Sequence, residues 1–163
     1  MLRSRSPYSS RKSERIHRMS SKALPFTDRE LSRAWRSLRR TANAEQRDNT
    51  HRLLLFYAVE CGLKAVWLKK QSKTLFDGDA IHRFGHELNA IIKDLMLGHA
   101  SNLLPASVQL SAVTVNSGRI PRAGGLDAIH QVWRYGGQLN VPTDVEMEAR
   151  LENMAQWIAK ELS

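Results

Sequence analysis

Hydrophobic residues recur with the period of an α-helix in several segments, and the first of these begins after residue 27. Thr27 and Glu30 have the spacing of a capping box, in which each side chain accepts a hydrogen bond from the other residue's backbone N–H. Phe26 and Leu31 occupy the two positions of a hydrophobic staple. The apolar residues that follow form one stripe and predict an amphipathic helix: Leu31, Ala34, Trp35, Leu38 and Ala42.

A second helix is predicted over residues 49–70, and its centre is apolar nearly all round. A helix of this kind usually lies in the middle of a core. Glu60 interrupts the apolar run, and Lys64 follows one turn later. A Glu–Lys pair at this spacing stabilises helices in general. If Glu60 is buried, it needs a cationic or N–H partner.

Three more helices are predicted further along the chain, over residues 85–97, over 126–135 and after Thr143. A polar connector, residues 71–80, precedes the first of them, and Gly136 and Gly137 end the second. Thr143 and Glu146 form another capping box at the start of the last helix. The apolar stripe of that helix consists of Met147, Leu151, Met154, Ile158 and Leu162.

Residues 99–125 give the weakest pattern. Pro105 can open a helix with apolar positions at Leu104, Val108, Ala112 and Val115, although Val113-Thr114-Val115 also suits a strand. The helical neighbourhood favours the helix, and residues 117–125 are expected to form a loop. The predicted fold class is therefore all-α, a bundle of four to six helices over residues 26–163.

The net charge of +9 comes from the N-terminal end. Residues 1–40 hold 12 Lys and Arg against 3 Asp and Glu, whereas residues 41–163 hold 13 of each kind. Residues 1–22 are rich in Ser and Arg and poor in large apolar side chains, so residues 1–25 are expected to form a disordered basic arm. Such an arm attracts polyanions by releasing their counterions. A solubilising tail, or a translation start at Met19, is the alternative.

Basic residues also cover much of the first predicted helix. They form either a solvated face or a surface that follows a phosphate backbone. On the second interpretation the nucleic-acid-binding residues are Arg29, Arg33, Arg36, Arg39 and Arg40 of the helix, with Arg11, Lys12, Arg15 and Arg18 of the arm.

Several classes of protein do not fit the sequence. No apolar run approaches the roughly 20 residues of a membrane span, and no secretory signal is evident. Cys61 is the single cysteine, which excludes an internal disulfide and a zinc site built on thiolates, and a reducing cytoplasm fits best. His82 and His86 are four residues apart but lack the His-Glu-x-x-His order. No phosphate loop, dinucleotide fingerprint or serine hydrolase elbow occurs, so no metal and no cofactor is expected.

Candidate chemistry is confined to polar residues at helix ends beside the apolar core: Glu60, His86, His130, Arg134 and Tyr135. Two short segments and one arginine that include some of these residues resemble a known family. Glu60-Cys-Gly-Leu-Lys64, Gly85-His-Glu-Leu88 and Arg134 together resemble the HEPN superfamily (higher eukaryotes and prokaryotes nucleotide-binding), over residues 28–162. The resemblance implies a helical bundle that commonly forms dimers. It also implies either a metal-independent RNase of toxin–antitoxin, CRISPR-associated or anti-phage systems, or a non-catalytic RNA-binding or scaffolding module.

The catalytic signature of that family is incomplete in this chain. The signature is an Arg followed, after four to six residues, by a His, but the corresponding positions after Arg134 hold Leu139, Asn140 and Val141. An amide cannot act as a general base. The leading prediction is therefore a non-catalytic or degenerate HEPN-like module that binds RNA or a partner protein in a bacterial defence or toxin–antitoxin system, as a homodimer or with an operon-encoded partner.

Two alternatives remain open. One is a metal-independent endoribonuclease that uses Arg134 with His86 or His130 and with Glu60 nearby. The other is a purely structural subunit that docks on a larger protein through the helices of Trp35 or Trp157.

Overall fold

The computed structural model describes residues 24–95 and 104–163. Six α-helices lie in this part of the chain, together with a single 3₁₀ turn, η2 (Leu126–Ala128), that leads into α5. The helices are α1 (Asp28–Thr41), α2 (Asn49–Lys70), α3 (Gly78–Phe84), α4 (Leu88–Asp94), α5 (Ile129–Arg134) and α6 (Asp144–Glu161). None of them is both long enough and apolar enough to span a membrane.

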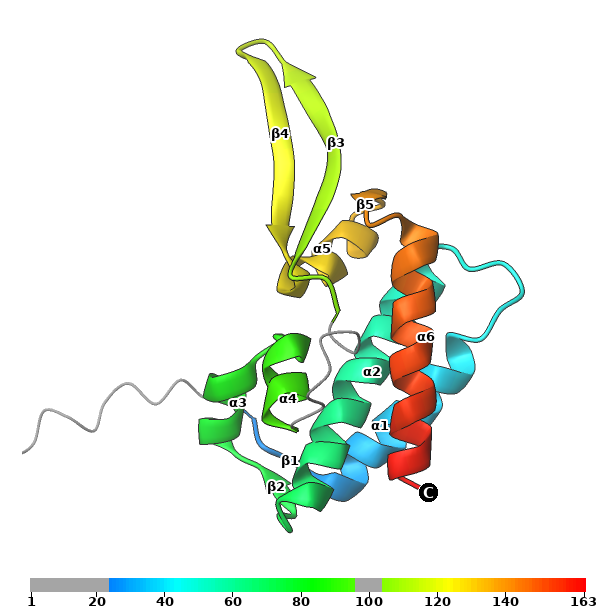
Figure 1. The fold of residues 1–163 in the computed structure, drawn as a ribbon, viewed down its shortest axis with the longest axis vertical. Helices are drawn as coiled ribbons and strands as arrows, with labels where there is room; N and C mark the ends of the chain where they lie inside the picture. The colour runs from blue at the N-terminus through cyan, green and yellow to red at the C-terminus, as the bar shows by residue number, and fades with distance from the viewer. Residues whose placement is uncertain (1–23, 96–103) are drawn as a thin grey trace, which may run out of the picture.

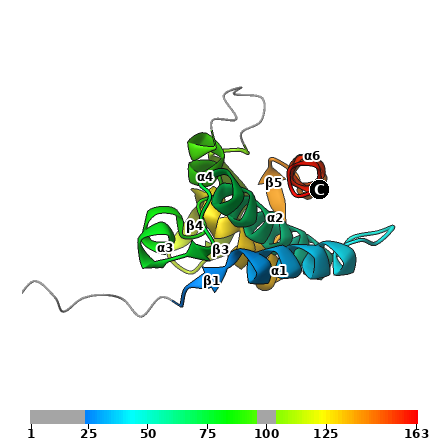
Figure 2. The same cartoon turned by 90° about the horizontal axis from the view of Figure 1, so that it is seen from below.

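The helix α2 forms the centre of the core (Figures 1 and 2). α1 and α6 pack along it, and α4 and α5 contact it as well. Its nearly continuous apolar surface explains this position, because Leu55, Phe56, Val59, Leu63 and Val66 are all fully buried. The prediction of a central helix over residues 49–70 is confirmed.

Both predicted capping boxes are present, at Thr27–Glu30 and at Thr143–Glu146. A third box, which the sequence analysis missed, joins Asp48 to His51 at the start of α2. The single helix predicted over residues 85–97 is wrong in its first part. Gly85 has a positive φ of 50° and follows α3, a helix that the sequence analysis did not predict and that begins in the last three residues of the polar connector. α4 begins only at Leu88.

The predicted all-α fold class is also wrong, because the described residues form five β-strands in two small antiparallel sheets. β1 (Phe26–Thr27) pairs with β2 (Leu75–Phe76). β3 (Ser107–Val115), β4 (Gly118–Gly125) and β5 (Leu139–Val141) form the second sheet in the order β4-β3-β5. β3 and β4 make a long hairpin that projects from the helical body (Figure 1). The helix expected after Pro105 and the loop expected over residues 117–125 are therefore the two strands of this hairpin.

A break in the strand's alternation of apolar and polar residues explains the error. The apolar residues Val108, Leu110, Val113 and Val115 do not alternate strictly, because the register shifts between Leu110 and Val113. A bulge of this kind adds one residue to a strand and breaks the period of two that identifies strands in a sequence. Pro121, with the glycines of β4, adds apparent loop signals to what is an edge strand, where proline is tolerated.

Ion pairs join α6 to α1 and to the start of α2. Carboxylates spaced by one turn along α6 form ion pairs with three arginines of the N-terminal half: Asp144 and Glu148 with Arg52, Glu148 and Glu152 with Arg47, and Glu152 with Arg39. Asp144 is buried and also accepts from Trp133 Nε1 at 2.9 Å. This network fixes α5 and α6 against the first two helices.

Gly62 marks the closest approach of helices in the core. A Cβ atom at this position would lie 2.7 Å from Ile158 Cγ2 and 3.0 Å from Trp35 Cε3, so α1, α2 and α6 all meet there. We expect Gly62→Val to lower the free energy of unfolding by about 2–4 kcal/mol, since the new methyl groups have no space. Urea unfolding followed by circular dichroism measures the change. Gly78→Ala is the control, because nothing lies within 4 Å of a Cβ there, and an equal loss in both variants would contradict the packing argument.

Candidate functional site

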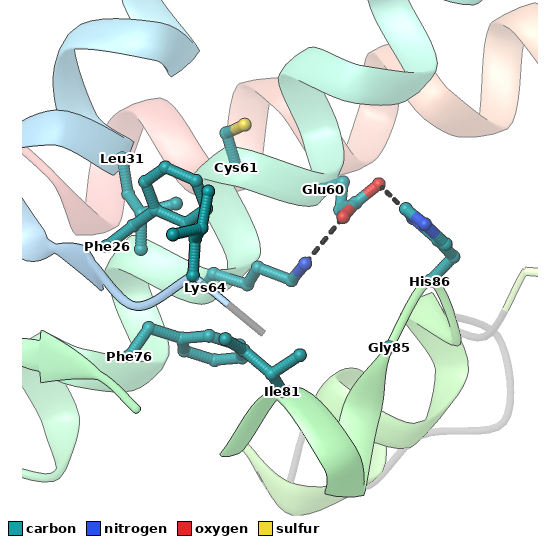
Figure 3. Close-up of a pocket in the computed structure, with 10 residues that line it drawn as sticks. Phe26, Leu31, Glu60, Cys61, Lys64, Phe76, Ile81, Gly85 and His86 are labelled. Atoms are coloured by element: carbon teal, nitrogen blue, oxygen red, sulfur yellow. Dashed lines mark hydrogen bonds and ion pairs between the residues drawn. The ribbon is translucent and has the colours of Figure 1, made fainter. Parts of the chain in front are cut away.

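One face of α2 supplies three polar side chains, Tyr57, Glu60 and Lys64, at a spacing that places them on adjacent turns. Glu60 is only 6 % exposed, and its two carboxylate oxygens contact two different side chains. Lys64 Nζ lies 2.5 Å from Oε1, and His86 Nδ1 lies 3.0 Å from Oε2 (Figure 3). A buried Glu60 was predicted to need a partner, and the structure gives it two, Lys64 and His86.

His86 lies in the turn between α3 and α4. Gly85 ends α3 with its positive φ, and this conformation directs the next residue toward α2. The His86 imidazole contacts Glu60 on one side, and its ring centroid lies 5.1 Å from that of His130 on the other. Its side chain is 55 % exposed, so the imidazole is accessible to solvent.

His130 and Arg134 come from α5, four residues apart on one face of that helix. The His130 ring packs beside both Phe56 and Tyr57, with centroid distances of 6.0 and 6.3 Å. Arg134 Nη2 donates to the Tyr57 hydroxyl at 2.6 Å. Six side chains therefore follow one another in a continuous polar row: Lys64, Glu60, His86, His130, Tyr57 and Arg134.

The two imidazoles of the polar row have different surroundings. His130 Nδ1 is buried and has no hydrogen-bond partner among the described residues. A buried N–H without an acceptor costs more than a buried lone pair, so we assign the proton of neutral His130 to Nε2. His86 Nδ1 lies against the Glu60 carboxylate, which favours the proton on Nδ1 and leaves Nε2 as a base. The surroundings of His86 therefore favour a proton acceptor at Nε2. His130 can donate a proton only as the imidazolium, because the N–H of a neutral imidazole is far too weak an acid.

Two charged groups, Arg134 in the row and Glu87 next to His86, have pKa values displaced from their ordinary ones. The hydrogen bond to Tyr57 raises the pKa of Arg134, which keeps the guanidinium charged. Burial, followed by repulsion from Asp127, raises the pKa of Glu87. The row itself therefore carries the fixed positive charges of Arg134 and Lys64 against a single carboxylate, Glu60.

A cavity of about 320 Å³ opens beside the Glu60 end of the row (Figure 3). Its walls are mostly apolar, with Phe26, Leu31, Phe76 and Ile81 facing the Glu60–Lys64 ion pair. Cys61 also lines it, and burial raises the pKa of this thiol to about 11. A thiol with this pKa stays protonated at neutral pH, as expected for an inert structural cysteine.

No group of three or more His, Cys, Asp or Glu side chains within residues 24–95 and 104–163 is arranged to hold a metal ion. The polar row combines two imidazoles, a guanidinium and an ammonium instead. Groups of this kind transfer protons and stabilise phosphate charge. The chemistry that the row can support is therefore general acid–base catalysis on a phosphate ester, or binding of one.

A second set of residues lies on α1. Arg29, Arg33, Arg36 and Arg40 are all exposed and recur every three or four residues, so they form one line along the helix, which we call the arginine stripe. Within residues 24–95 and 104–163 none of the four makes an ion pair, whereas Arg39 is only half-exposed and pairs with Glu152 at 2.6 Å. Arg11, Lys12, Arg15 and Arg18 lie outside the described residues, as does almost all of the predicted basic arm.

Of the four residues proposed for catalysis, Glu60, His86 and His130 lie next to one another, whereas Arg134 is exposed and connects to them only through Tyr57. The sequence analysis missed Tyr57, which connects His130 to Arg134. Its position three residues before Glu60, on the same face of α2, is the signal that identifies it. Asn140, at the position of the family's histidine, lies away from the row and donates to Ser111 Oγ at 3.0 Å.

Comparison with known proteins adds no further constraint. No protein-family model matches the chain, and no curated protein or solved structure matches it either. The resemblance to the HEPN superfamily therefore rests on the motif residues alone and stays a prediction. The polar row and the arginine stripe are therefore the features of this chain that point to a function.

Proposed function

We propose that this chain is an RNA-binding module and that the arginine stripe of α1 is its principal contact with the phosphate backbone. The observation that carries the proposal is the set of four exposed arginines without carboxylate partners in the described residues. From Arg29 to Arg40 the stripe extends over about 16 Å, at 1.5 Å per residue, with one guanidinium in each turn. Guanidinium groups in this arrangement bind successive phosphates.

The charge distribution supports the same proposal. The acidic residues of α6 are already paired with Arg39, Arg47 and Arg52, so these cations do not add to a binding surface. Four of the cations that remain lie in one line on the exposed face of α1, and the positive charge continues in the sequence of residues 1–22, which holds seven Lys and Arg against one Glu. A surface of this kind binds nucleic acid with strong dependence on salt.

Replacing Arg29, Arg33, Arg36 and Arg40 with alanine is expected to weaken binding of single-stranded RNA at least about tenfold at physiological salt. The slope of log affinity against log salt concentration should fall by about 3, since each phosphate contact on a single strand contributes about 0.7. Fluorescence anisotropy with a labelled oligoribonucleotide measures both quantities, and a DNA oligonucleotide of the same sequence tests the preference for RNA.

The matched control removes the same charge elsewhere, at four exposed cations: Lys93, Arg119, Arg150 and Lys160. This variant should lose much less affinity than the stripe variant. Equal losses would mean that net charge alone attracts RNA, and an unchanged affinity of the stripe variant would remove α1 from the interface.

A second candidate function, metal-independent cleavage of RNA, is favoured by one further observation. The rings of His86 and His130 lie 5.1 Å apart, and Tyr57 connects them to Arg134. His86, oriented by Glu60, is suited to take the proton of a ribose 2′-hydroxyl, and the imidazolium form of His130 to protonate the leaving 5′-oxygen through Nε2–H. Loss of RNA cleavage in EDTA on replacing either histidine tests this function.

The setting implied by the resemblance belongs to the proposal as well. It comprises the cytoplasm of a bacterium and a defence or toxin–antitoxin system with an operon-encoded partner. Docking on a larger protein through the helices of Trp35 or Trp157 stays a structural alternative. Trp35 itself is only 5 % exposed, so such a contact would use other residues of α1. Co-purification with the products of neighbouring genes tests this setting.

A further inference from the structure

Tyr135 is an exposed aromatic residue next to the polar row that the proposed function does not use. It directly follows Arg134 and caps the C-terminal end of α5. Within residues 24–95 and 104–163, Phe26 and Tyr135 are the exposed aromatic residues, at 46 and 78 %. Aromatic rings supply much of the apolar area that a core buries, so most of them are covered. The Tyr135 ring therefore contributes little to the core and is available for a ligand.

The chain after Tyr135 leaves the space beside the ring open. Gly136 has a positive φ of 73°, and Gly137 N–H donates to the Val132 carbonyl at 2.8 Å, so the helix ends in a glycine turn. Apart from the adjoining residues, nothing lies within 4 Å of a Cβ at Gly136. The two residues that follow Tyr135 thus bring no side chain that could cover it.

The Arg134 guanidinium is held beside this ring. Its Nη2 donates to the Tyr57 hydroxyl at 2.6 Å, which fixes it at the end of the polar row. Tyr57, and after it Tyr135, raise the pKa of Arg134, so both phenol groups lie close to the guanidinium. Arg134 is exposed and a guanidinium has five N–H donors, so donors remain for the oxygens of an anion. A cation and an open aromatic ring therefore lie together at this end of the row.

We propose that Tyr135 stacks on an unpaired base of the RNA while Arg134 binds the phosphate of the same nucleotide. This inference rests on the proposed function and names the residue that distinguishes single strands from duplexes. Base and phosphate are joined through one ribose, so two adjacent residues can contact both. Stacking on an aromatic ring tolerates any base, because every base has a π face. In a duplex the bases are stacked on one another and are not open to Tyr135.

Fluorescence anisotropy with a single-stranded oligoribonucleotide and with the duplex of the same sequence tests the proposal. Tyr135→Ala should weaken binding of the single strand roughly five- to a hundredfold, as expected for one stacked base, and should leave binding of the duplex unchanged. Tyr135→Phe is the matched control, since it keeps the ring, and it should bind like the wild type. Unchanged affinity of Tyr135→Ala for the single strand, equal losses on strand and duplex, or a loss in Tyr135→Phe as large as in Tyr135→Ala would each overturn the proposal.

The salt dependence distinguishes this contact from the arginine stripe. A stacked base releases no counterions, so Tyr135→Ala should keep the wild-type slope of log affinity against log salt concentration, whereas the stripe variant should lower it by about 3. Loss of affinity in Tyr135→Ala with no change in the stripe variant would contradict the stripe alone, and the reverse result would contradict the stacking alone.

Photo-cross-linking tests the contact directly. Single-stranded RNA that carries 5-iodouridine should become linked to Tyr135 on irradiation, and mass spectrometry of the digested protein identifies the linked residue. Duplex RNA with the same label should give much less of this product. Linkage of the single strand at other residues, with none at Tyr135, would refute the stacking.

Discussion

Replacing Glu60 with alanine is expected to lower the free energy of unfolding by about 3–5 kcal/mol, because it leaves the Lys64 ammonium uncompensated in an apolar environment. The side chains of Glu60 and Lys64 are only 8 and 13 % exposed, and Nζ lies 5.2 Å from the centre of the Phe76 ring. His86 contributes less to the loss, since it is half-exposed and water replaces its partner. Chemical denaturation of wild type and variant at pH 7 measures the difference.

Two controls isolate the ion pair from the packing around it. In Glu60→Ala with Lys64→Met no buried charge remains, so the double variant should recover most of the stability that Glu60→Ala loses. Glu161→Ala breaks a comparable pair with Lys70 whose side chains are 28 and 48 % exposed, and it should cost less than about 1 kcal/mol. If the double variant is no more stable than Glu60→Ala, the lost stability comes from something other than the unpaired lysine.

The segments that the sequence analysis predicted well are those with local signals strong enough to decide their structure. The capping boxes and the apolar surface of residues 49–70 identify α1, α2 and α6, because caps and periodicity act within a few residues. The hairpin has no such signal. Its bulge between Leu110 and Val113 breaks the alternation, and its outer half is not buried by the chain, so burial does not impose a pattern on its sequence.

The polar row could be predicted only in part, for a related reason. Glu60, His86 and Arg134 were identified as polar residues at helix ends beside an apolar core. That placement is wrong for Glu60, which lies in the middle of α2, whereas His86 precedes α4 and Arg134 ends α5. The contact between His86 and His130 depends on how α5 packs on α2, which no local pattern describes. Tyr57 was missed because a tyrosine in an apolar helix is usually a core residue, and only its partner Arg134 distinguishes it.

If the polar row cleaves RNA, replacing His86 or His130 with alanine should each lower kcat/KM by about 10²–10⁴. In this reaction His86 Nε2 takes the proton of the 2′-hydroxyl, the 2′-oxygen attacks phosphorus, and the bond from phosphorus to the 5′-oxygen breaks. The His130 imidazolium donates its Nε2 proton to the departing oxygen and becomes neutral, so the products are a 2′,3′-cyclic phosphate and a 5′-hydroxyl. Arg134→Ala should cost about 10²–10³, because the guanidinium stabilises charge that develops on the phosphoryl oxygens.

The assay distinguishes this reaction from metal-dependent cleavage and from cleavage by a contaminating nuclease. Cleavage should persist in EDTA, fail on RNA with a single 2′-deoxyribose at the scissile position, and depend on pH in a bell shape, since one imidazole must be neutral and the other able to donate. His82→Ala, which removes an exposed histidine of α3 outside the row, is the matched control and should be as active as wild type. Equal activity in all three histidine variants would assign the cleavage to a contaminant. RNA left intact by concentrated wild-type protein would contradict cleavage by the polar row. The two imidazoles would then have a role only in binding a phosphate.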